Sequence, residues 1–321
     1  MKSTAIANSN IAFVKYWGKK DILLNIPMNN SISMTLDEKV STKTTVEFSE
    51  KYKIDELILN NERQSGEKLL RVSNFLDLIR KKASINFKAK VVSVNNFPTA
   101  VGIASSASGF AALAAASTKA LNLKLNEKEL SALARQGSGS ASRSIYGGFV
   151  EWKEEYAEQI KNETHWPELR DIIVVVSDKE KHMSSREAMK ITVDTSALYK
   201  KRIQNINFTL FKIKRLIINK EFTMLMEALM KESDNMHDCM ADSNPKIVYL
   251  NEESKEIKSI IRNINSKNIK AGYTFDAGPN AHIITQDTYV PEIIYALGKY
   301  KTNIIISKPG KGIQYTEAHL F

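Results

Sequence analysis

The chain has 321 residues, 43% of them hydrophobic and 26% charged, with a formal net charge of +10 at pH 7. This length exceeds that of a usual single domain, so we expect one large domain or two closely joined ones. No run of apolar residues is long enough to span a membrane, and no apolar signal segment follows Met1, so we expect a cytoplasmic protein with no membrane partner.

The charge and the single cysteine narrow the class of protein. The excess of 46 Lys and Arg over 36 Asp and Glu is compatible with nucleic acid, an anionic membrane or a polyanionic metabolite as partner. Because the basic residues are dispersed among acids and form no tract, we do not expect nucleic acid. Cys239 is alone, which excludes an internal disulfide and a cysteine-rich zinc site, and a buried packing role is expected for it.

Hydrophobic periodicity predicts that the chain begins with a sheet and continues with helices. Strands rich in β-branched residues are expected over residues 3–14, 42–48, 56–59 and 89–94, and another over 149–153. Helices are expected over residues 68–82, 107–121 and 126–135. The last of these has the capping-box spacing, with Asn126 followed by Glu129.

A charged, proline-containing connection near residues 163–170 predicts a domain boundary, giving domains 1–170 and 171–321. The second half is expected to hold strands 171–176, 272–275, 282–285 and 303–307, and helices 188–207, 208–231 and 253–264. Strands and helices interleave without a regular βαβ rhythm and no repeat is present, so the expected fold class is α+β.

The segment F-P-T-A-V-G-I-A-S-S-A-S-G-F, from Phe97 to Phe110, is the strongest functional signal in the residues themselves. Its small side chains let backbone N–H groups approach an anion, and the start of the following helix adds the positive end of a dipole. Ser105 and Ser106 can add hydroxyl ligands to phosphate or its Mg2+. Close packing is the commoner cause of such a composition, so the interpretation depends on the other clusters.

The cluster N-S-N-I-A-F-V-K-Y-W-G-K-K-D, residues 8–21, brings Asn10, Lys15, Tyr16 and Lys19 to a strand end. Lysines beside a phenol can clamp phosphate oxygens. The alternative is an aromatic residue packed at a strand end with solvated lysines.

A second cluster, Q-G-S-G-S-A-S-R-S-I-Y-G-G at residues 136–148, is too rich in glycine and serine for a regular element. The Ser138 and Ser140 hydroxyls suit an anion, and Arg143 can hold a carboxylate bidentately. A flexible surface loop is the alternative.

Two later segments add charge. In A-G-Y-T-F-D-A-G-P-N-A, residues 271–281, Asp276 follows a strand and can act as a base or steer charge, or else simply form the turn. In H-M-S-S-R-E-A-M, residues 182–189, Ser185 and Arg186 lie at a helix start, where capping explains the serines equally well.

In this order the motifs resemble those of the diphosphomevalonate decarboxylase family, within the superfamily of galactokinase, homoserine, mevalonate and phosphomevalonate (GHMP) kinases. The resemblance runs from Ala7 to about Ala281 and includes L-N-I-P-M-N-N-S-I-S-M-T-L at residues 24–36 and D-S-N-P-K-I-V-Y-L-N at 242–251. It implies a GHMP-kinase-like α+β fold of two lobes around a central cleft, and a homodimer. The N-terminal lobe, 1–170, is expected to resemble ribosomal protein S5 domain 2 and bind ATP; the C-terminal lobe, 171–321, is expected to be ferredoxin-like.

The family converts mevalonate 5-diphosphate, with ATP and Mg2+, to isopentenyl diphosphate, ADP, phosphate and CO2. Hydroxide leaves poorly, so the 3-hydroxyl is phosphorylated before phosphate and the carboxylate depart. The resemblance implies that Asp276 lies beside this hydroxyl, to accept its proton or stabilise the developing cation, with Lys15 near both. It implies that Arg143 holds the C1 carboxylate. A decarboxylase or 3-kinase acting on another mevalonate phosphate is the alternative.

The resemblance also implies the binding residues. Those expected for the substrate are Tyr16, Lys19, Ser138, Ser140, Arg143, Ser185 and Arg186. Those expected for the ATP phosphates are Val101, Gly102, Ile103, Ala104, Ser105, Ser106, Ala107 and Ser108, with Ser105 or Ser106 reaching Mg2+. The sequence departs from many members at Asn8, where proline is usual, and at Ser142, where cysteine is usual; neither departure removes a charge.

Overall fold

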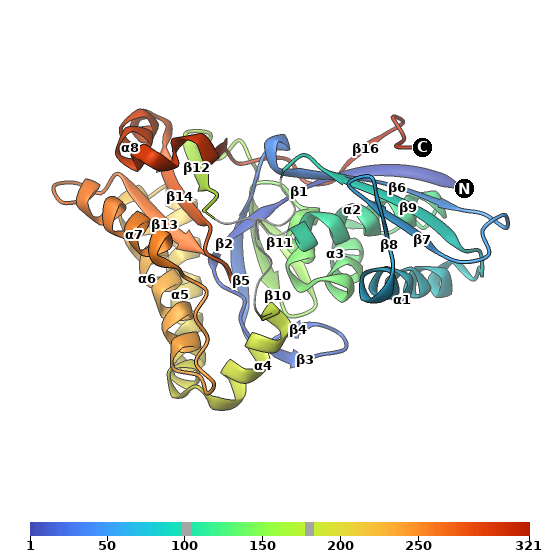
Figure 1. Cartoon of the computed structure of the whole chain (residues 1–321), viewed down its shortest axis with the longest axis horizontal. Helices are drawn as coiled ribbons and strands as arrows, with labels where there is room; N and C mark the ends of the chain where they lie inside the picture. Colours follow the sequence, from blue (N-terminus) through green and yellow to red (C-terminus); the bar gives the residue numbers. More distant parts are fainter. Residues whose placement is uncertain (98–104, 177–182) are drawn as a thin grey trace.

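A computed structural model describes residues 1–97, 105–176 and 183–321 (Figure 1). The described elements form the expected α+β fold, in which strands pair antiparallel except for β7 with β9. Figure 1 shows the two chain ends close together, because the last strand, β16, pairs with the first, β1. Within the described residues, no helix combines the length and apolar character needed to cross a membrane.

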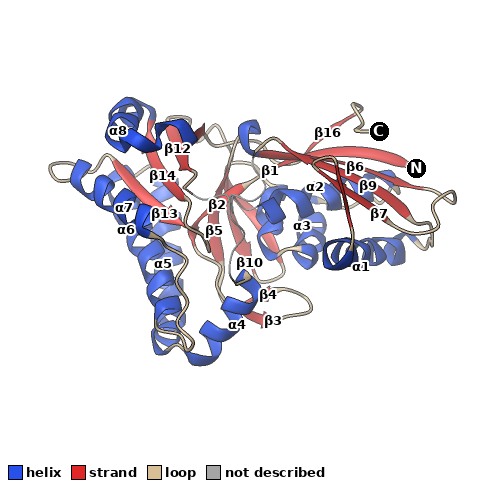
Figure 2. Ribbon diagram, viewed as in Figure 1, coloured by secondary structure: helices blue, strands red, loops and turns tan. Residues whose placement is uncertain are grey.

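The first sheet has the strand order β16-β1-β6-β9-β7-β8. Its strands are β1 (Lys2–Asn8), β6 (Ser41–Phe48), β7 (Glu56–Leu59), β8 (Glu62–Gln64), β9 (Ala89–Asn95) and β16 (Gln314–Thr316). Figure 2 shows helices α1 (Gly66–Ala83), α2 (Ser105–Ala120) and α3 (Glu127–Gly137) on one side of it. The alanines of α2 are buried against β1 and β6, since short side chains allow a helix to approach a sheet closely.

A second sheet has the order β11-β10-β5-β2, formed by β2 (Asn10–Val14), β5 (Ser31–Thr35), β10 (Phe149–Lys153) and β11 (Tyr156–Lys161). The single strand expected over 3–14 is therefore wrong, because the chain changes sheets at Ser9. The Ser9 N–H donates to the carbonyl of Val40 at 2.8 Å, and its carbonyl accepts from Leu36 N–H at 2.8 Å. A ribbon of β3 (Lys19–Asp21) and β4 (Ile26–Pro27) follows β2.

The third sheet has the order β13-β14-β12-β15. Its strands are β12 (Leu169–Val174), β13 (Ala271–Phe275), β14 (Ala281–Gln286) and β15 (Ile304–Ser307). The helices of this half are α4 (Ser185–Thr195), α5 (Ala197–Asn219), α6 (Phe222–Ala241), α7 (Glu252–Ile264) and α8 (Val290–Leu297). Helix α6 contacts both β2 and β13 and so connects the second sheet to the third.

The helix boundaries expected at 188–207 and 208–231 are wrong. The first break is at Ser196, whose side chain accepts from Tyr199 N–H as an N-cap and donates to Asp242 Oδ2 at 2.8 Å. The second is at Lys220, which ends α5 with a left-handed backbone, φ 57°. Neither break interrupts the apolar periodicity, because one depends on a contact from a distant segment and the other on a residue that seldom adopts this conformation.

The flexible loop considered for 136–148 is also not observed. The segment forms the end of α3 and a buried 3-10 helix, Gly139–Ile145. Gly139 packs so tightly that an added Cβ would lie 2.7 Å from Trp152 and 3.2 Å from Tyr16. The glycine and serine content therefore reflects close approach of backbone to aromatic rings.

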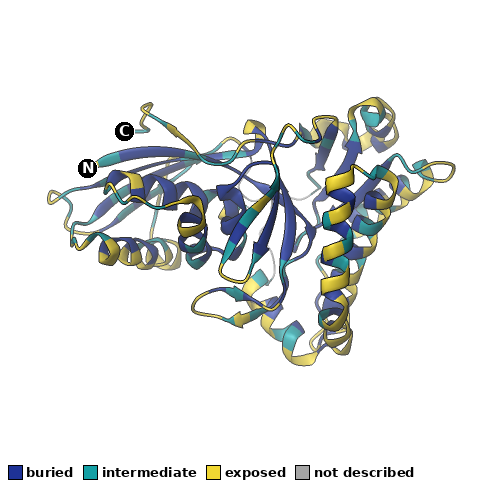
Figure 3. Cartoon of the chain, turned by 180° about the vertical axis from the view of Figure 1, so that it is seen from behind, coloured by how far each residue is buried: buried dark blue, intermediate teal, exposed yellow. Residues whose placement is uncertain are grey.

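Burial follows the same layers. Figure 3 shows exposed residues along the outer surfaces of the helices and buried residues on the strands behind them. Cys239 is fully buried in α6 beside Met236 and Met240, which confirms its expected packing role, and burial raises the pKa of its thiol to about 11.

Candidate active site

A cavity of about 360 Å3 lies where the ends of β2, the β3–β4 ribbon, α3 and α4 meet the segment after β13. Helices α1, α2 and α6 each contribute to its wall. The cavity collects most of the residues expected from sequence to bind substrate: Lys15, Tyr16, Lys19, Ser106, Ser138, Ser140, Arg143, Ser185, Arg186 and Asp276.

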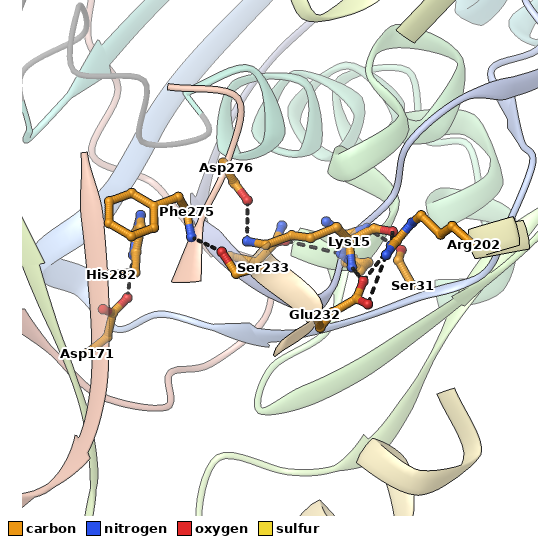
Figure 4. A network of polar contacts seen from close by, with 11 residues as sticks. Lys15, Ser31, Asp171, Arg202, Glu232, Ser233, Phe275, Asp276 and His282 are labelled. Atoms are coloured by element: carbon orange, nitrogen blue, oxygen red, sulfur yellow. Dashed lines mark hydrogen bonds and ion pairs between the residues drawn. The ribbon is translucent and has the colours of Figure 1, made fainter. Parts of the chain in front are cut away.

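Lys15 and Asp276 form an ion pair in this cavity, with Nζ and Oδ1 2.7 Å apart (Figure 4). The Lys15 side chain is 2% exposed and that of Asp276 is 33% exposed. Burial lowers the pKa of Lys15, and the charge of Asp276 offsets part of that effect. Burial works to raise the pKa of Asp276, but the nearby charges, with Lys15 foremost, bring it down to about 2. Asp276 is therefore a carboxylate at neutral pH.

Arg143 is held rigidly by polar neighbours. Its Nε donates to Asn10 Oδ1 at 3.2 Å, and its Nη1 donates to Ser31 Oγ at 2.5 Å. Burial lowers the pKa of Arg143 to about 10, against the opposing effect of Asp276. In the part of the chain that the structure describes, no carboxylate forms an ion pair with this guanidinium. A fixed, unpaired guanidinium in a cavity suits a carboxylate of a ligand.

A second group of cations, Lys19, Arg71 and Arg186, lies in the same cavity. Burial first, and then the charges of Arg186 and Arg71, lower the pKa of Lys19 to about 8. Lys19 Nζ donates to Asn25 Oδ1 at 2.5 Å, and Arg71 Nη2 donates to the carbonyl of Gly137 at 2.8 Å. Like charges held together without ionised partners favour binding of a polyanion.

Serine hydroxyls complete this region. Ser106 Oγ lies 3.2 Å from Ser138 Oγ, which in turn lies 3.4 Å from Ser140 Oγ. At the start of α4, the helix cap is Ser184, which accepts from Glu187 N–H at 3.2 Å. Capping therefore accounts for Ser184, while Ser185 and Arg186 line the cavity beside it.

The segment expected to hold the ATP phosphates is described only in part. Val101, Gly102, Ile103 and Ala104 lie outside the described residues, and α2 begins at Ser105. Ser106 lines the cavity at this helix N-terminus, where backbone N–H groups favour an anion.

The next two expected residues point elsewhere. Ala107 is fully buried, and the Ser108 hydroxyl bonds into the core, 2.7 Å from Thr42 Oγ1 and 3.2 Å from Ser9 Oγ. The expectation for Ala107 and Ser108 is therefore corrected to their backbone at the start of α2, since the Ser108 side chain is engaged in the core.

Three features of the cavity were missed by sequence reasoning. Arg71 lies in the middle of an amphipathic helix, far from every motif, and reaches the cavity only because α1 packs near the end of α3. Asn25 has a left-handed backbone, φ 53°, and its amide bonds both Lys19 and the carbonyls that end α3. The hydroxyl of Tyr16 and the indole N–H of Trp17 are buried and have no partner among the described residues.

Comparisons with known proteins agree with this site. The model of the diphosphomevalonate decarboxylase-like N-terminal domain matches residues 7–163, and that of the mevalonate 5-diphosphate decarboxylase C-terminal domain matches residues 171–315. The diphosphomevalonate decarboxylase of Candida albicans is 40% identical, over 98% of this chain and 91% of its own length.

Solved structures give the same result. The crystal structure of mevalonate diphosphate decarboxylase from Staphylococcus aureus is 40% identical, with a TM-score of 0.94 and 98% of both chains covered. A neighbour described as MDDEF in complex with MVAPP, AMPPCP and magnesium is 37% identical, with a TM-score of 0.94 and 99% of both chains covered. This chain therefore belongs to the diphosphomevalonate decarboxylase family.

Proposed function

We propose that this chain catalyses the ATP-dependent decarboxylation of mevalonate 5-diphosphate to isopentenyl diphosphate, ADP, phosphate and CO2, in the mevalonate pathway of isoprenoid biosynthesis. The observation that carries the proposal is the convergence of Asp276, Lys15 and Arg143, which are far apart in sequence, on one cavity that also holds unpaired cations. One end of the cavity then suits the diphosphate and the other suits the carbon centre that reacts.

The low pKa of Asp276 bears on its role. A carboxylate with a pKa of about 2 is a weak base but keeps its negative charge throughout the physiological range. Such a charge is well suited to stabilise the positive charge that develops at the tertiary carbon as phosphate departs. We therefore favour cation stabilisation as its main task, with the proton of the 3-hydroxyl passing to Asp276 during phosphoryl transfer.

Lys15 and Arg143 have complementary roles in this mechanism. The Lys15 ammonium keeps Asp276 ionised and lies where it can offset charge on the transferring phosphoryl group. The planar guanidinium of Arg143 holds the C1 carboxylate until the bond between C1 and C2 breaks, leaving its electrons in the new double bond and releasing CO2. Lys19, Arg71 and Arg186, with Ser138, Ser140 and Ser185, would bind the diphosphate.

ATP supplies the phosphoryl group that turns the 3-hydroxyl into a leaving group, and Mg2+ offsets the charge of its phosphates. The residues present fit both: Ser106 lies at the N-terminus of α2 inside the cavity, and Ser105 is next to it. Within the described residues no group of three or more His, Cys, Asp or Glu could hold a metal ion. We therefore propose Mg2+ coordination by the phosphates with one hydroxyl, from Ser105 or Ser106.

A substrate panel tests the function. The purified protein is mixed with mevalonate or its 5-phosphate, 5-diphosphate or 3,5-bisphosphate, with and without ATP and Mg2+, and CO2 and ADP are measured. We expect CO2 and ADP in equal amounts, with the 5-diphosphate as the best substrate. ADP with a stable 3-phosphate product and no CO2 would instead identify a 3-kinase, and preference for another phosphate would identify the alternative decarboxylase.

Three further expectations complete the proposal. We propose the lobes 1–170 and 171–321, supported by the position of their boundary between the two stretches that the family models match. We also propose a homodimer, to be checked by sedimentation, and a cytoplasmic location, to be checked by cell fractionation. Both rest on the family resemblance.

A further inference from the structure

Helix α6 lies between the edges of two sheets. β2 is the last strand of the order β11-β10-β5-β2, and β13 is the first of the order β13-β14-β12-β15. Each of these strands therefore has one side without a neighbouring strand in the described structure, and α6 contacts both. Lys15 directly follows β2, and Asp276 directly follows β13.

Glu232, in the middle of α6, holds the backbone of Lys15. The Lys15 N–H donates to Glu232 Oε1 at 2.9 Å (Figure 4). Glu232 is in turn paired with Arg202 of α5, whose Nη1 lies 2.9 Å from Glu232 Oε2. Arg202 also donates from Nη2 to the Lys15 carbonyl at 3.2 Å. Both main-chain polar groups of Lys15 are thus held by one buried ion pair.

Ser233, the next residue of α6, holds the other half of the pair. It is fully buried, and its Oγ accepts from the N–H of Phe275 at 3.0 Å. Phe275 immediately precedes Asp276, and its ring meets the edge of His237, one turn further along α6, at 6.3 Å between ring centroids. The backbone that presents Asp276 is therefore fixed to the same helix turn.

We propose that Glu232 and Ser233 are positioning residues, which together set the separation of Lys15 and Asp276 by holding the backbones that carry them. Neither residue is among those that line the cavity in the described structure, so they act through the ion pair and not on the substrate. Adjacent positions on a rigid helix keep two distant segments in fixed register. A displacement of about 1 Å at reacting groups can cost about 100-fold in rate. The inference rests on the proposed decarboxylase function.

The first test replaces the Ser233 acceptor. In Ser233→Ala we expect the single-turnover rate of CO2 release to fall about 10- to 100-fold, with KM for both substrates within about twofold of the parent, because the binding groups stay in place. Ser233→Cys, which keeps a weak acceptor, should be intermediate. The matched control is Thr285→Val, which removes another fully buried hydroxyl of the same half, bonded to the Lys270 carbonyl at 2.7 Å.

The second test isolates the acceptor at Glu232. Glu232→Gln and Glu232→Met both remove the charge opposite Arg202 and have similar size, but only Gln keeps an oxygen for the Lys15 N–H. We expect Glu232→Gln to release CO2 at least about tenfold faster than Glu232→Met at equal KM. Because the two variants share the lost ion pair, a purely structural role would affect both equally. This pair decides the matter even where one Ser233 variant fails to fold.

The outcomes separate the two proposals. A parent enzyme that releases no CO2 contradicts the proposed function. An active parent whose folded Ser233→Ala variant keeps its rate contradicts only the positioning role. The same holds where the Glu232→Gln and Glu232→Met rates are equal, or where Thr285→Val loses as much activity as Ser233→Ala.

Discussion

Removing the positive charge of Lys15 should change both the rate of the enzyme and its pH dependence. A pKa of about 2 for Asp276, against an ordinary 3.8, corresponds to a net stabilisation of the carboxylate of about 2.5 kcal/mol, at about 1.4 kcal/mol per unit. Because the side chain is one-third exposed, solvent screening makes this an upper figure. Lys15→Met removes the largest contribution that opposes burial, so the pKa of Asp276 should rise by roughly two units.

The direction of the pH effect follows from this change. In the parent, Asp276 stays ionised down to about pH 2, so it adds no acidic limb to kcat in the usual range. In Lys15→Met, activity should fall as pH drops from about 6 towards 4, because a growing share of Asp276 is protonated. We also expect kcat at pH 7 to fall about 100-fold or more, as for other removed electrostatic groups.

The assay is CO2 release at saturating substrate between pH 4.5 and pH 8. Lys214→Met is the matched control, since Lys214 forms an ion pair of the same 2.7 Å length with Glu151, outside the cavity. Lys15→Met should remain folded, because burial lowers the pKa of Lys15 and the charged ammonium is itself disfavoured inside the protein. A folded Lys15→Met enzyme with parental kcat and an unchanged acidic limb would refute the reasoning.

Three further predictions concern the binding groups. Because the pKa of Lys19 is about 8, kcat/KM for the diphosphate should fall above that pH, and Lys19→Met should raise KM about 10- to 100-fold and abolish this alkaline limb; an alkaline limb that persists in the variant would contradict the assignment. Arg143→Lys keeps the charge but not the planar fork, so kcat/KM should drop at least about tenfold, and parental kinetics would exclude bidentate binding. Gly18→Ala should destabilise the protein to urea by about 1–3 kcal/mol and raise KM, because the backbone has φ +88° and the new Cβ would lie 2.2 Å from the Tyr199 hydroxyl. Gly66→Ala is its control, since Gly66 also has positive φ but nothing within 4 Å; equal losses in the two variants would exclude the clash as the cause.

The candidate site shows where sequence reasoning succeeds. Lys15, Arg143 and Asp276 were each marked by a short motif of small residues around one charge, and the structure brings them to one cavity. The capping box at Asn126 and Glu129 was also predictable and is confirmed, because both its hydrogen bonds are local. Signals of this kind act over three or four residues and therefore survive in the linear pattern.

Other residues gave no such signal. Arg71 has the same pattern as any exposed arginine of an amphipathic helix until α1 packs beside the end of α3. Glu232 reads as one more charge in a polar run, although it is 4% exposed and bonded to the Lys15 backbone. Ser108 belongs to the phosphate motif, yet its hydroxyl bonds to Thr42 in the core.

The sequence by itself determined the local order: which segments are helix or strand, the α+β class, and the chemical character of the groups available for an anionic substrate. Apolar periodicity and small-residue motifs carry that information because they depend on neighbours along the chain. Only the tertiary structure decided which charges meet, because the Lys15–Asp276 contact joins residues 261 positions apart. Burial and the charge of Lys15 then act on Asp276 together, and neither effect exists before the sheets and α6 have packed.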